Sequence, residues 1–244
     1  MKTLLAALRS TLFDLLLLLF TPLFSAIALL IFPLPALVRY RVISYWARSA
    51  VWLARIVCGV RYQIIGAEHI PQAPCVVLSK HQSAWETMAF QVIFPPQVWV
   101  LKRELLRLPF FGWGLAMMSP IAIDRSAGRE ALRQLLEQGK QRLAHGFWVV
   151  IFPEGTRIAP GRRGKYHVGG AWFAARSGAA VLPVAHNAGE LWGKKAFIKY
   201  PGTITVSIGE PIATQGMKPD DIISRVENWI ESEMQRLNGK ARAA

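Results

Sequence analysis

A histidine and a carboxylate stand five positions apart, at His81 and Glu86, directly after a short apolar run. Residues 75–79 are rich in β-branched side chains and short enough for a buried strand, whereas residues 84–90 have the pattern of a helix. Two residues five apart inside one helix point about 140° away from each other, but a histidine just outside the first turn can fold back onto a carboxylate within it. The spacing therefore predicts a general base with its own orienting partner at a helix start.

Glu86 also has a structural interpretation. Ser83-x-x-Glu86 matches a capping box, in which the serine caps the helix and the glutamate bonds back to the backbone N–H of the cap. His81, taken alone, is compatible with a polar loop residue. The sequence leaves the orienting role and the capping role of Glu86 open.

A second polar block follows residues 147–152, an apolar run with the pattern of another buried strand. This block is Pro-Glu-Gly-Thr-Arg, at residues 153–157. Ligands of open α/β sheets bind beyond the carboxyl ends of the strands, so we expect both polar blocks at the same rim of one sheet. Arg157 is a candidate for holding a phosphate there, because a guanidinium binds phosphate oxygens through paired hydrogen bonds.

The two blocks resemble those of the lysophospholipid acyltransferase family. The resemblance covers residues 62–211, and Phe-Pro-Glu-Gly-Thr-Arg at residues 152–157 matches the family's substrate-binding block at every position. Residues 119–125 are similar to the intermediate block of the family, and residues 181–184 to its last block. Order and spacing along the chain also agree.

The resemblance implies transfer of an acyl chain from acyl-CoA or acyl carrier protein to the free hydroxyl of 1-acyl-sn-glycerol-3-phosphate, giving phosphatidic acid. It implies no resident cofactor and no acyl-enzyme. A neutral His81 would take the hydroxyl proton during attack, and Glu86 would hold the other ring nitrogen. Backbone N–H groups at the start of the following helix are the expected donors to the reaction oxyanion.

The same resemblance implies the binding residues. Arg157 would grip the acceptor phosphate, with Glu154 ordering it or contacting the glycerol, and Gly155 would allow close backbone approach. Arg125 is equally compatible with a structural turn that includes Asp124, and the basic loop after the second block with a solvated charge run. The expected acceptor-binding residues are Glu154, Gly155, Thr156, Arg157 and Arg125, and the expected donor or headgroup contacts are Arg162, Arg163 and Lys165.

Two positions depart from the family pattern. Most members have Asp where this chain has Glu86, and a Gly commonly stands in place of Ser119. The departures keep open the same chemistry on a different lyso-lipid acceptor. A catalytically silent membrane lipid-binding protein is the alternative from another class, whereas a lipid hydrolase lacks support because the chain has no Gly-x-Ser-x-Gly motif.

Net charge narrows the class of partner. The 244-residue chain carries a formal charge of +14, which favours nucleic acid, or an anionic membrane surface with phosphorylated substrates. Nine tryptophans, a positive mean hydropathy and a long apolar amino terminus are unusual for a nucleic-acid binder, and the chain has no nucleic-acid-binding motif. We expect no nucleic acid; the expected partners are anionic membrane lipids, lysophosphatidic acid, and acyl-CoA or acyl carrier protein.

The amino terminus contains an uncharged segment long enough to be a membrane anchor. Residues 15–38 carry no charge, and as a helix these 24 residues would extend about 36 Å. Pro22, Pro33 and Pro35 interrupt the segment, so a kinked span and a helical hairpin inserted into one leaflet both remain open. A cleaved signal peptide fits less well, because no small-x-small site closes the run. Arginines after the segment predict a catalytic domain facing the cytoplasm at the inner membrane.

Alternating strands and helices predict an α/β fold with a mixed, largely parallel sheet flanked by helices, of the glycerolipid acyltransferase type that the resemblance implies. We expect residues 1–61 to form a membrane-anchoring helical segment and residues 62–244 the catalytic domain. Cys58 and Cys75 are too few for a metal cluster, and we expect no metal site. The predicted strands are 62–65, 75–79, 98–101, 121–123, 147–152, 181–185 and 204–208, and the predicted helices are 84–94, 130–143, 170–177 and 219–237.

Overall fold

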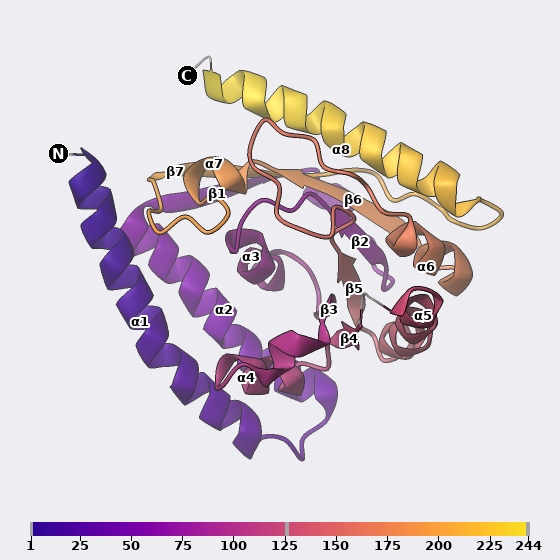
Figure 1. Ribbon diagram of the computed structural model, residues 1–244, viewed down its shortest axis with the longest axis horizontal. Helices are drawn as coiled ribbons and strands as arrows, with labels where there is room; N and C mark the ends of the chain where they lie inside the picture. The colour runs from indigo at the N-terminus through magenta and orange to yellow at the C-terminus, as the bar shows by residue number, and fades with distance from the viewer. Residues whose placement is uncertain (1, 125–126, 243–244) are drawn as a thin grey trace.

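A mixed sheet forms the centre of the protein. The computed structural model describes the backbone of residues 2–124 and 127–242 and the side chains of residues 3–124 and 127–237. Within these residues seven strands pair in the order β1-β7-β6-β2-β5-β3-β4, and all neighbours are parallel except β6 and β7 (Figure 1). The predicted mixed, largely parallel sheet is therefore confirmed. The strands are β1 Val60–Ile65, β2 Val76–Ser79, β3 Gln97–Lys102, β4 Ile121–Ile123, β5 Trp148–Ile151, β6 Val181–His186 and β7 Gly202–Ile208.

The central strands are continuous apolar runs. Every residue of β2, β5 and β6 is buried, which is typical of strands that helices cover on both faces. Figure 1 shows the sheet between two helical layers, with α2 and α3 on one face and α5, α6 and α8 on the other. The helices are α1 Lys2–Leu30, α2 Ala36–Cys58, α3 Trp85–Ile93, α4 Phe111–Met117, α5 Arg129–Ala144, α6 Gly169–Ser177, α7 Ala188–Leu191 and α8 Pro219–Arg242, with short 3₁₀ turns η1 Ala67–His69 and η2 Arg103–Arg107.

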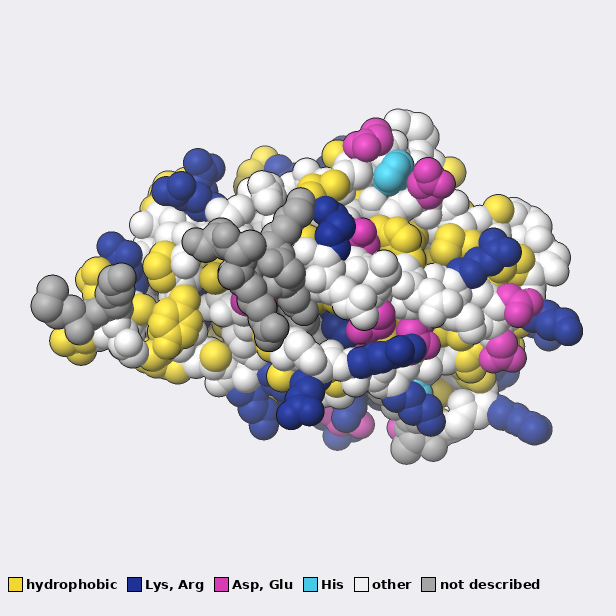
Figure 2. Space-filling view, turned by 90° about the horizontal axis from the view of Figure 1, so that it is seen from above, with side chains coloured by type: hydrophobic (Ala, Val, Ile, Leu, Met, Phe, Trp, Pro, Cys, Tyr) yellow, Lys and Arg dark blue, Asp and Glu magenta, His cyan; other side chains and the backbone are white. Residues whose placement is uncertain are grey.

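The last helix, α8, is amphipathic and covers one face of the sheet. Ile222, Val226, Ile230 and Met234 recur every four residues and are buried where α8 packs on β6 and α6. Charged side chains of both signs are scattered over the face of the molecule that is seen from above (Figure 2). The helix predicted at the carboxyl end of the chain is confirmed, and its buried stripe makes it part of the core.

The amino-terminal residues form a helical hairpin. α1 continues through Pro22, and a turn leads the chain back along α1 as α2. The segment Thr3–Leu30 is long and apolar enough to cross a membrane, and few of its residues are buried. α1 is therefore a candidate membrane anchor. Its exposed leucines are Leu4, Leu5, Leu8, Leu12, Leu15, Leu18, Leu19, Leu23, Leu29 and Leu30.

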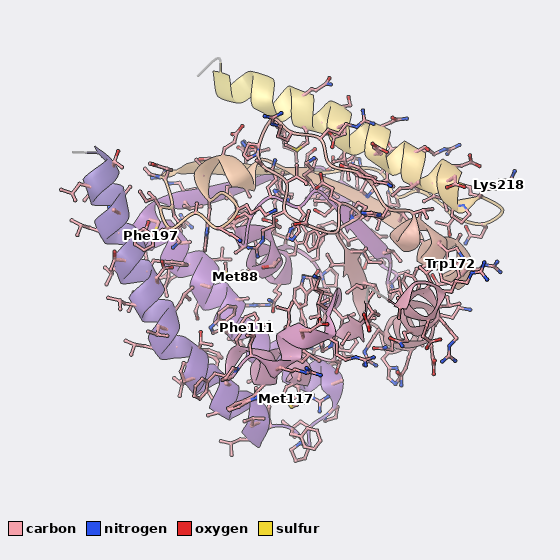
Figure 3. All side chains as sticks on the ribbon, viewed as in Figure 1. Met88, Phe111, Met117, Trp172, Phe197 and Lys218 are labelled. Atoms are coloured by element: carbon pink, nitrogen blue, oxygen red, sulfur yellow. The ribbon has the colours of Figure 1, made fainter. Side chains whose placement is uncertain are left out.

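A polar clamp ties α1 to the catalytic part of the chain. The two carboxylate oxygens of Asp14 lie 2.6 and 2.7 Å from Nζ of Lys199, and Oγ of Ser10 accepts the backbone N–H of Lys199 at 2.9 Å. The ring centroids of Phe13 and Phe197 lie 5.2 and 5.5 Å from the same Nζ, and Phe197 is labelled beside α1 in Figure 3. These contacts hold one face of α1 against the protein.

α2 packs into the core. Its buried residues recur with the period of a helix, which brings most of them onto one face that packs on α3 and β1. The helix ends at Gly59, whose φ of +73° is a conformation that glycine adopts readily. The sequence assigns this stretch to the anchoring segment because its arginines and tryptophans match a membrane interface equally well. The buried residues are Tyr40, Ile43, Ser44, Ala47, Ala50, Val51, Leu53, Ala54 and Cys58.

Truncation tests where the catalytic unit begins, since the predicted boundary at residue 62 separates α2 from the sheet. Removing residues 1–61 would expose the apolar surfaces that α2 covers, so we expect this chain to lose cooperative thermal unfolding. Removing residues 1–34 keeps α2, and we expect a folded protein that no longer floats with vesicles. Circular dichroism on heating and vesicle flotation measure the two effects. A chain lacking residues 1–61 that unfolds at the full-length temperature would instead support the boundary at residue 62.

Candidate active site

His81 lies between the end of β2 and the start of α3, with its ring turned toward Glu86. Nδ1 of His81 and Oε1 of Glu86 are 2.8 Å apart. The same oxygen accepts the backbone N–H groups of Gln82 at 2.9 Å and of Ser83 at 2.8 Å. Oγ of Ser83 in turn accepts the backbone N–H of Trp85 at 3.1 Å. The carboxylate oxygen that holds the histidine therefore also accepts the N–H of Ser83, as the glutamate of a capping box does, so the two interpretations of Glu86 are compatible.

The same contacts engage two backbone N–H groups that lie between His81 and α3. The backbone N–H groups at this helix start are the donors that the sequence offers to a reaction oxyanion. In the structure, the N–H groups of Gln82 and Ser83 both donate to Glu86. These two groups lie before α3 and are already bonded to the buried carboxylate, and oxyanion donors at the helix start itself stay a prediction.

The charge states favour His81 as a base. Burial by itself raises the pKa of the Glu86 carboxyl, but nearby His186 and hydrogen bonds from His81 and Ser83 lower this pKa overall. An ionised Glu86 only accepts hydrogen bonds, so the proton of the shared bond is on Nδ1 of His81. Nε2 of the neutral ring is then the nitrogen that can accept a proton.

A second histidine, His186, lies buried behind Glu86. Its Nε2 is 4.0 Å from Oε1 of Glu86 and donates to the carbonyl of Lys80 at 2.9 Å, while its Nδ1 accepts the N–H of Ala188 at 3.3 Å. Complete burial lowers the pKa of His186, against the raising effect of the nearby Glu86 carboxylate. Our sequence analysis misses His186, although a histidine closing a buried strand is the kind of signal that marks His81.

The second polar block holds the backbone and the ring of His81. β5 pairs with β2 in parallel, so both blocks lie at the same rim, as the sequence predicts. The N–H of His81 donates to Oε2 of Glu154 at 3.0 Å, and the carbonyl of His81 accepts the N–H of Ile158 at 2.8 Å. Its ring stacks on Phe152, with the two ring centroids 3.9 Å apart. These contacts leave the imidazole little freedom to turn.

Glu154 lies elsewhere than the resemblance implies. Its side chain is fully buried, with Oε1 2.7 Å from Nζ of Lys80 and Oε2 bonded to the N–H of His81. Both oxygens bond groups inside the protein, and Glu154 is not among the residues that line the cavity beside Arg157. Arg125, another expected acceptor residue, lies outside the described residues.

A cavity of about 560 Å³ opens beside His81, and its polar end is cationic. Lys194 and Lys195, which our sequence analysis misses, add two positive charges to that of Arg157. Nζ of Lys194 donates to Oγ1 of Thr156 at 3.3 Å, which joins the loop after α7 to the second polar block. Adjacent lysines after a strand and a short helix are the sequence signal for this site. The residues at this end are His81, Gly155, Thr156, Arg157, Lys194 and Lys195.

The rest of the cavity is mostly apolar, although Lys102, Gln91 and Thr87 also line it. It extends between the amino-terminal hairpin, α3 and α4, where Met88 of α3 and Phe111 of α4 are labelled in Figure 3. Trp46 of α2 is half-buried here, and its Nε1 donates to Oγ1 of Thr21 on α1 at 3.2 Å. The candidate anchor therefore supplies part of the wall. The apolar lining residues include Phe24, Ile43, Trp46, Met88, Trp99, Leu101, Leu105, Phe111, Leu115 and Met118.

The basic loop after the second polar block lies away from this cavity. Nη2 of Arg163 is 2.6 Å from Oε1 of Glu227 on α8, in an exposed ion pair. Arg162 and Lys165 are also exposed, and none of the three basic residues lines the cavity. Any contact that they make with a donor phosphate or a headgroup would lie outside it.

Comparison with known proteins identifies the family. Residues 61–187 match the family model described as Acyltransferase. This chain belongs to the acyltransferase family. It is 48% identical over 237 residues to 1-acyl-sn-glycerol-3-phosphate acyltransferase from Pseudomonas aeruginosa, an alignment that covers 95% of this chain and 92% of the relative. The family membership predicted from the two polar blocks is confirmed.

Two further relatives of this acyltransferase extend the comparison. The mouse 1-acyl-sn-glycerol-3-phosphate acyltransferase alpha is 29% identical over 178 residues, which cover 69% of this chain and 61% of the mouse protein. The crystal structure of the 1-acyl-sn-glycerophosphate (LPA) acyltransferase from Thermotoga maritima superposes with a TM-score of 0.82, over 98% of both chains and at 20% identity. This structural likeness establishes the fold.

The glycine that commonly stands at position 119 in the family has a backbone explanation. Ser119 has a φ of +58°, in the left-handed region that glycine adopts without strain. The serine carbonyl accepts a hydrogen bond of 2.7 Å from Nε of Arg142, and its side chain does not line the cavity. This departure from the family pattern therefore leaves the lining of the cavity unchanged.

Replacing Glu86 by Gln is expected to cost this acyltransferase both rate and stability. The amide keeps an oxygen for the cap but loses the charge that fixes the proton on His81, so we expect turnover to fall by about 10²–10⁴-fold. The weaker cap should cost about 1 kcal/mol of unfolding free energy. Steady-state rates and urea unfolding measure the two losses. Loss of one quantity without the other would show that Glu86 has a single role.

The stability cost of Glu86→Gln should also depend on pH. Folding lowers the pKa of Glu86, so its contribution to stability is complete above the value for an unfolded glutamate, about 4.3, and is lost as pH falls through the lower folded value. We therefore expect the difference in unfolding free energy between the two proteins to shrink below about pH 4.3. Urea unfolding between neutral and acid pH measures it. A difference that stays constant to the lowest pH would contradict a lowered pKa.

Proposed function

We propose that the protein transfers an acyl chain from acyl-CoA or acyl carrier protein to the free hydroxyl of 1-acyl-sn-glycerol-3-phosphate, giving phosphatidic acid. The observation that carries the proposal is the His81–Glu86 pair, which lies where a cationic recess meets an apolar cavity. A glycerol phosphate with an attached acyl chain has the same division into charged and apolar parts. The names of the bacterial and mouse relatives support this acceptor.

His81 acts as the general base. Its Nε2 takes the proton of the acceptor hydroxyl as the hydroxyl oxygen attacks the thioester carbonyl, and Glu86 stabilises the imidazolium that forms. The C–O bond of the product forms, the C–S bond of the donor breaks, and the imidazolium returns its proton to the departing thiolate. The acyl chain passes directly from donor to acceptor, so no acyl-enzyme is required.

The cationic recess holds the acceptor phosphate. Arg157 binds phosphate oxygens through paired hydrogen bonds, and the compact charges of Lys194 and Lys195 add attraction without fixed geometry. The apolar part of the cavity holds an acyl chain, since each CH₂ removed from water contributes about 0.8 kcal/mol. The substrate is thereby oriented with its hydroxyl between the two regions, next to His81.

The reaction takes place at the cytoplasmic face of the inner membrane. The exposed leucines of α1 match an apolar anchor, and the arginines of α2 favour the cytoplasmic side by the positive-inside rule. A formal charge of +14 favours anionic lipids. Lysophosphatidic acid and long-chain acyl donors partition into bilayers, so the anchor keeps the site where both are concentrated.

Thiol release by the purified protein in vesicles, measured with a panel of lyso-lipids, tests the proposal. We expect lysophosphatidic acid to be the preferred acceptor and phosphatidic acid the product, with acyl-CoA and acyl carrier protein compared as donors. His81→Ala should lower turnover by about 10²–10⁴-fold without unfolding the protein. Preference for another lyso-lipid would overturn the acceptor, and near-normal transfer by folded His81→Ala would remove His81 from the mechanism.

Arg157→Lys tests how the phosphate is held. Lysine keeps the charge but loses the paired hydrogen bonds, so the KM of the acceptor should rise several-fold more than the KM of the donor. The same variant should discriminate less between phosphorylated and unphosphorylated acceptors. Arg176→Lys, at an exposed arginine of α6 outside the cavity, is the matched control. Equal changes in both KM values would contradict a phosphate-holding role for Arg157.

A further inference from the structure

A buried lysine precedes the catalytic histidine, and three acceptors surround its ammonium group. The Lys80 side chain is 1% exposed, and its Nζ lies 2.7 Å from Oε1 of Glu154 and 2.8 Å from Oε1 of Glu231. The carbonyl of Arg162 lies 3.5 Å away. Removing one partner of such a buried ion pair is costly, because the charge left behind has no water to stabilise it. The positions of these groups are therefore tightly coupled.

The second carboxylate of this cluster comes from α8, far along the sequence. Glu231 is 17% exposed, and its Oε1 also accepts the hydroxyl of Tyr166 at 2.8 Å. Burial, together with the nearby carboxylates, raises the pKa of Tyr166, so its hydroxyl remains a donor. Glu231 is thus fixed from two sides. We refer to Lys80, Glu154 and Glu231 together as the lysine bracket.

The lysine bracket is hydrogen-bonded to the backbone of His81 through Glu154. Oε1 of Glu154 accepts from Lys80, and Oε2 of the same carboxylate accepts the N–H of His81 at 3.0 Å. An unbroken series of hydrogen bonds therefore runs from Glu231 on α8 to the backbone of His81. Glu86 fixes the ring of the histidine, whereas the bracket fixes the backbone from which that ring projects.

We propose that Lys80 and Glu231 are positioning residues for acyl transfer, which hold the backbone of His81 through Glu154 and so make α8 part of the active-site framework. The inference rests on the proposed function, since it takes His81 as the base. A base displaced by a fraction of an ångström loses alignment with the acceptor hydroxyl, although the acceptor still binds. Loss of the bracket therefore lowers kcat and leaves the KM of the acceptor unchanged.

Glu227 provides a matched control on the same helix. It lies about one turn before Glu231 and pairs with Arg163, in the loop that follows the second polar block. That pair is exposed and includes neither Lys80 nor His81. Glu231→Ala should lower kcat by about ten- to hundredfold, with the KM of the acceptor within twofold of wild type. Glu227→Ala should leave both constants near wild type. Glu231→Gln keeps an acceptor oxygen for Lys80 and Tyr166, and it should recover most of the lost rate.

The backbone amide of His81 gives a direct readout that does not depend on substrate. The chain has five histidines, so labelling the full-length protein with ¹⁵N-histidine gives few amide signals. The signal of the His81 amide is the one that is missing from the spectrum of His81→Gln. A charge-assisted bond to Glu154 places this amide proton downfield. We expect Glu231→Ala to move the signal upfield and Glu227→Ala to leave it in place.

The outcomes separate positioning from simple stabilisation. A fall in kcat together with a shifted His81 amide supports the proposal, and recovery of both by Glu231→Gln supports it further. Unchanged kcat in folded Glu231→Ala overturns it, as does a lower unfolding temperature with an unmoved amide. If Glu231→Ala does not fold, Glu231→Asp, which withdraws the carboxylate by one methylene, decides by the same two readouts. The amide is read without substrate, so it tests the bracket even if thiol release shows a different acceptor.

Discussion

The hydrogen bond of 2.8 Å between Nδ1 of His81 and Oε1 of Glu86 is the contact on which the rest of the site depends. It fixes the tautomer of the imidazole and directs Nε2 to the cavity, because an ionised carboxylate in a buried setting accepts and does not donate. Two backbone N–H groups just before α3 donate to the same oxygen, and nearby His186 and His81, together with the bond from Ser83, lower the pKa of that carboxyl. The same oxygen of Glu86 thus holds the imidazole and the backbone before α3, and a change to Glu86 disturbs both.

The topology of the sheet brings the remaining parts to this contact. β2 and β5 are parallel neighbours, so the block after β5 lies against the block after β2 although about seventy residues separate them. The hairpin of α1 and α2 then adds the apolar wall of the cavity through Phe24 and Trp46. α1 presents leucines to its surroundings and also lines the cavity beside His81. α1 therefore contributes both an exposed apolar surface and part of the cavity wall.

Much of this arrangement could be predicted from the sequence, because the determining patterns are local. The buried strands are short β-branched runs, and each polar block directly follows one of them. The role of α2 could not be predicted in the same way, since an amphipathic helix with arginines fits a protein core and a membrane surface equally well. The direction of the Glu154 side chain could not be predicted either. A motif locates the residue at the rim, but its direction depends on Lys80 and on Glu231, which is 151 positions from Lys80. No local pattern connects those charges.

The position of the proton on the His81 ring is the most direct test of His81 as the general base. In ¹⁵N-imidazole spectra of the full-length protein near neutral pH, we expect the His81 ring to carry its proton on Nδ1 and to have an unprotonated Nε2 that responds to bound acceptor. Replacing Glu86 by Gln should shift the population toward the other tautomer, since an amide can also donate to Nδ1. A wild-type ring with its proton on Nε2 would contradict the role of His81 as base, because that nitrogen could not then take the acceptor proton.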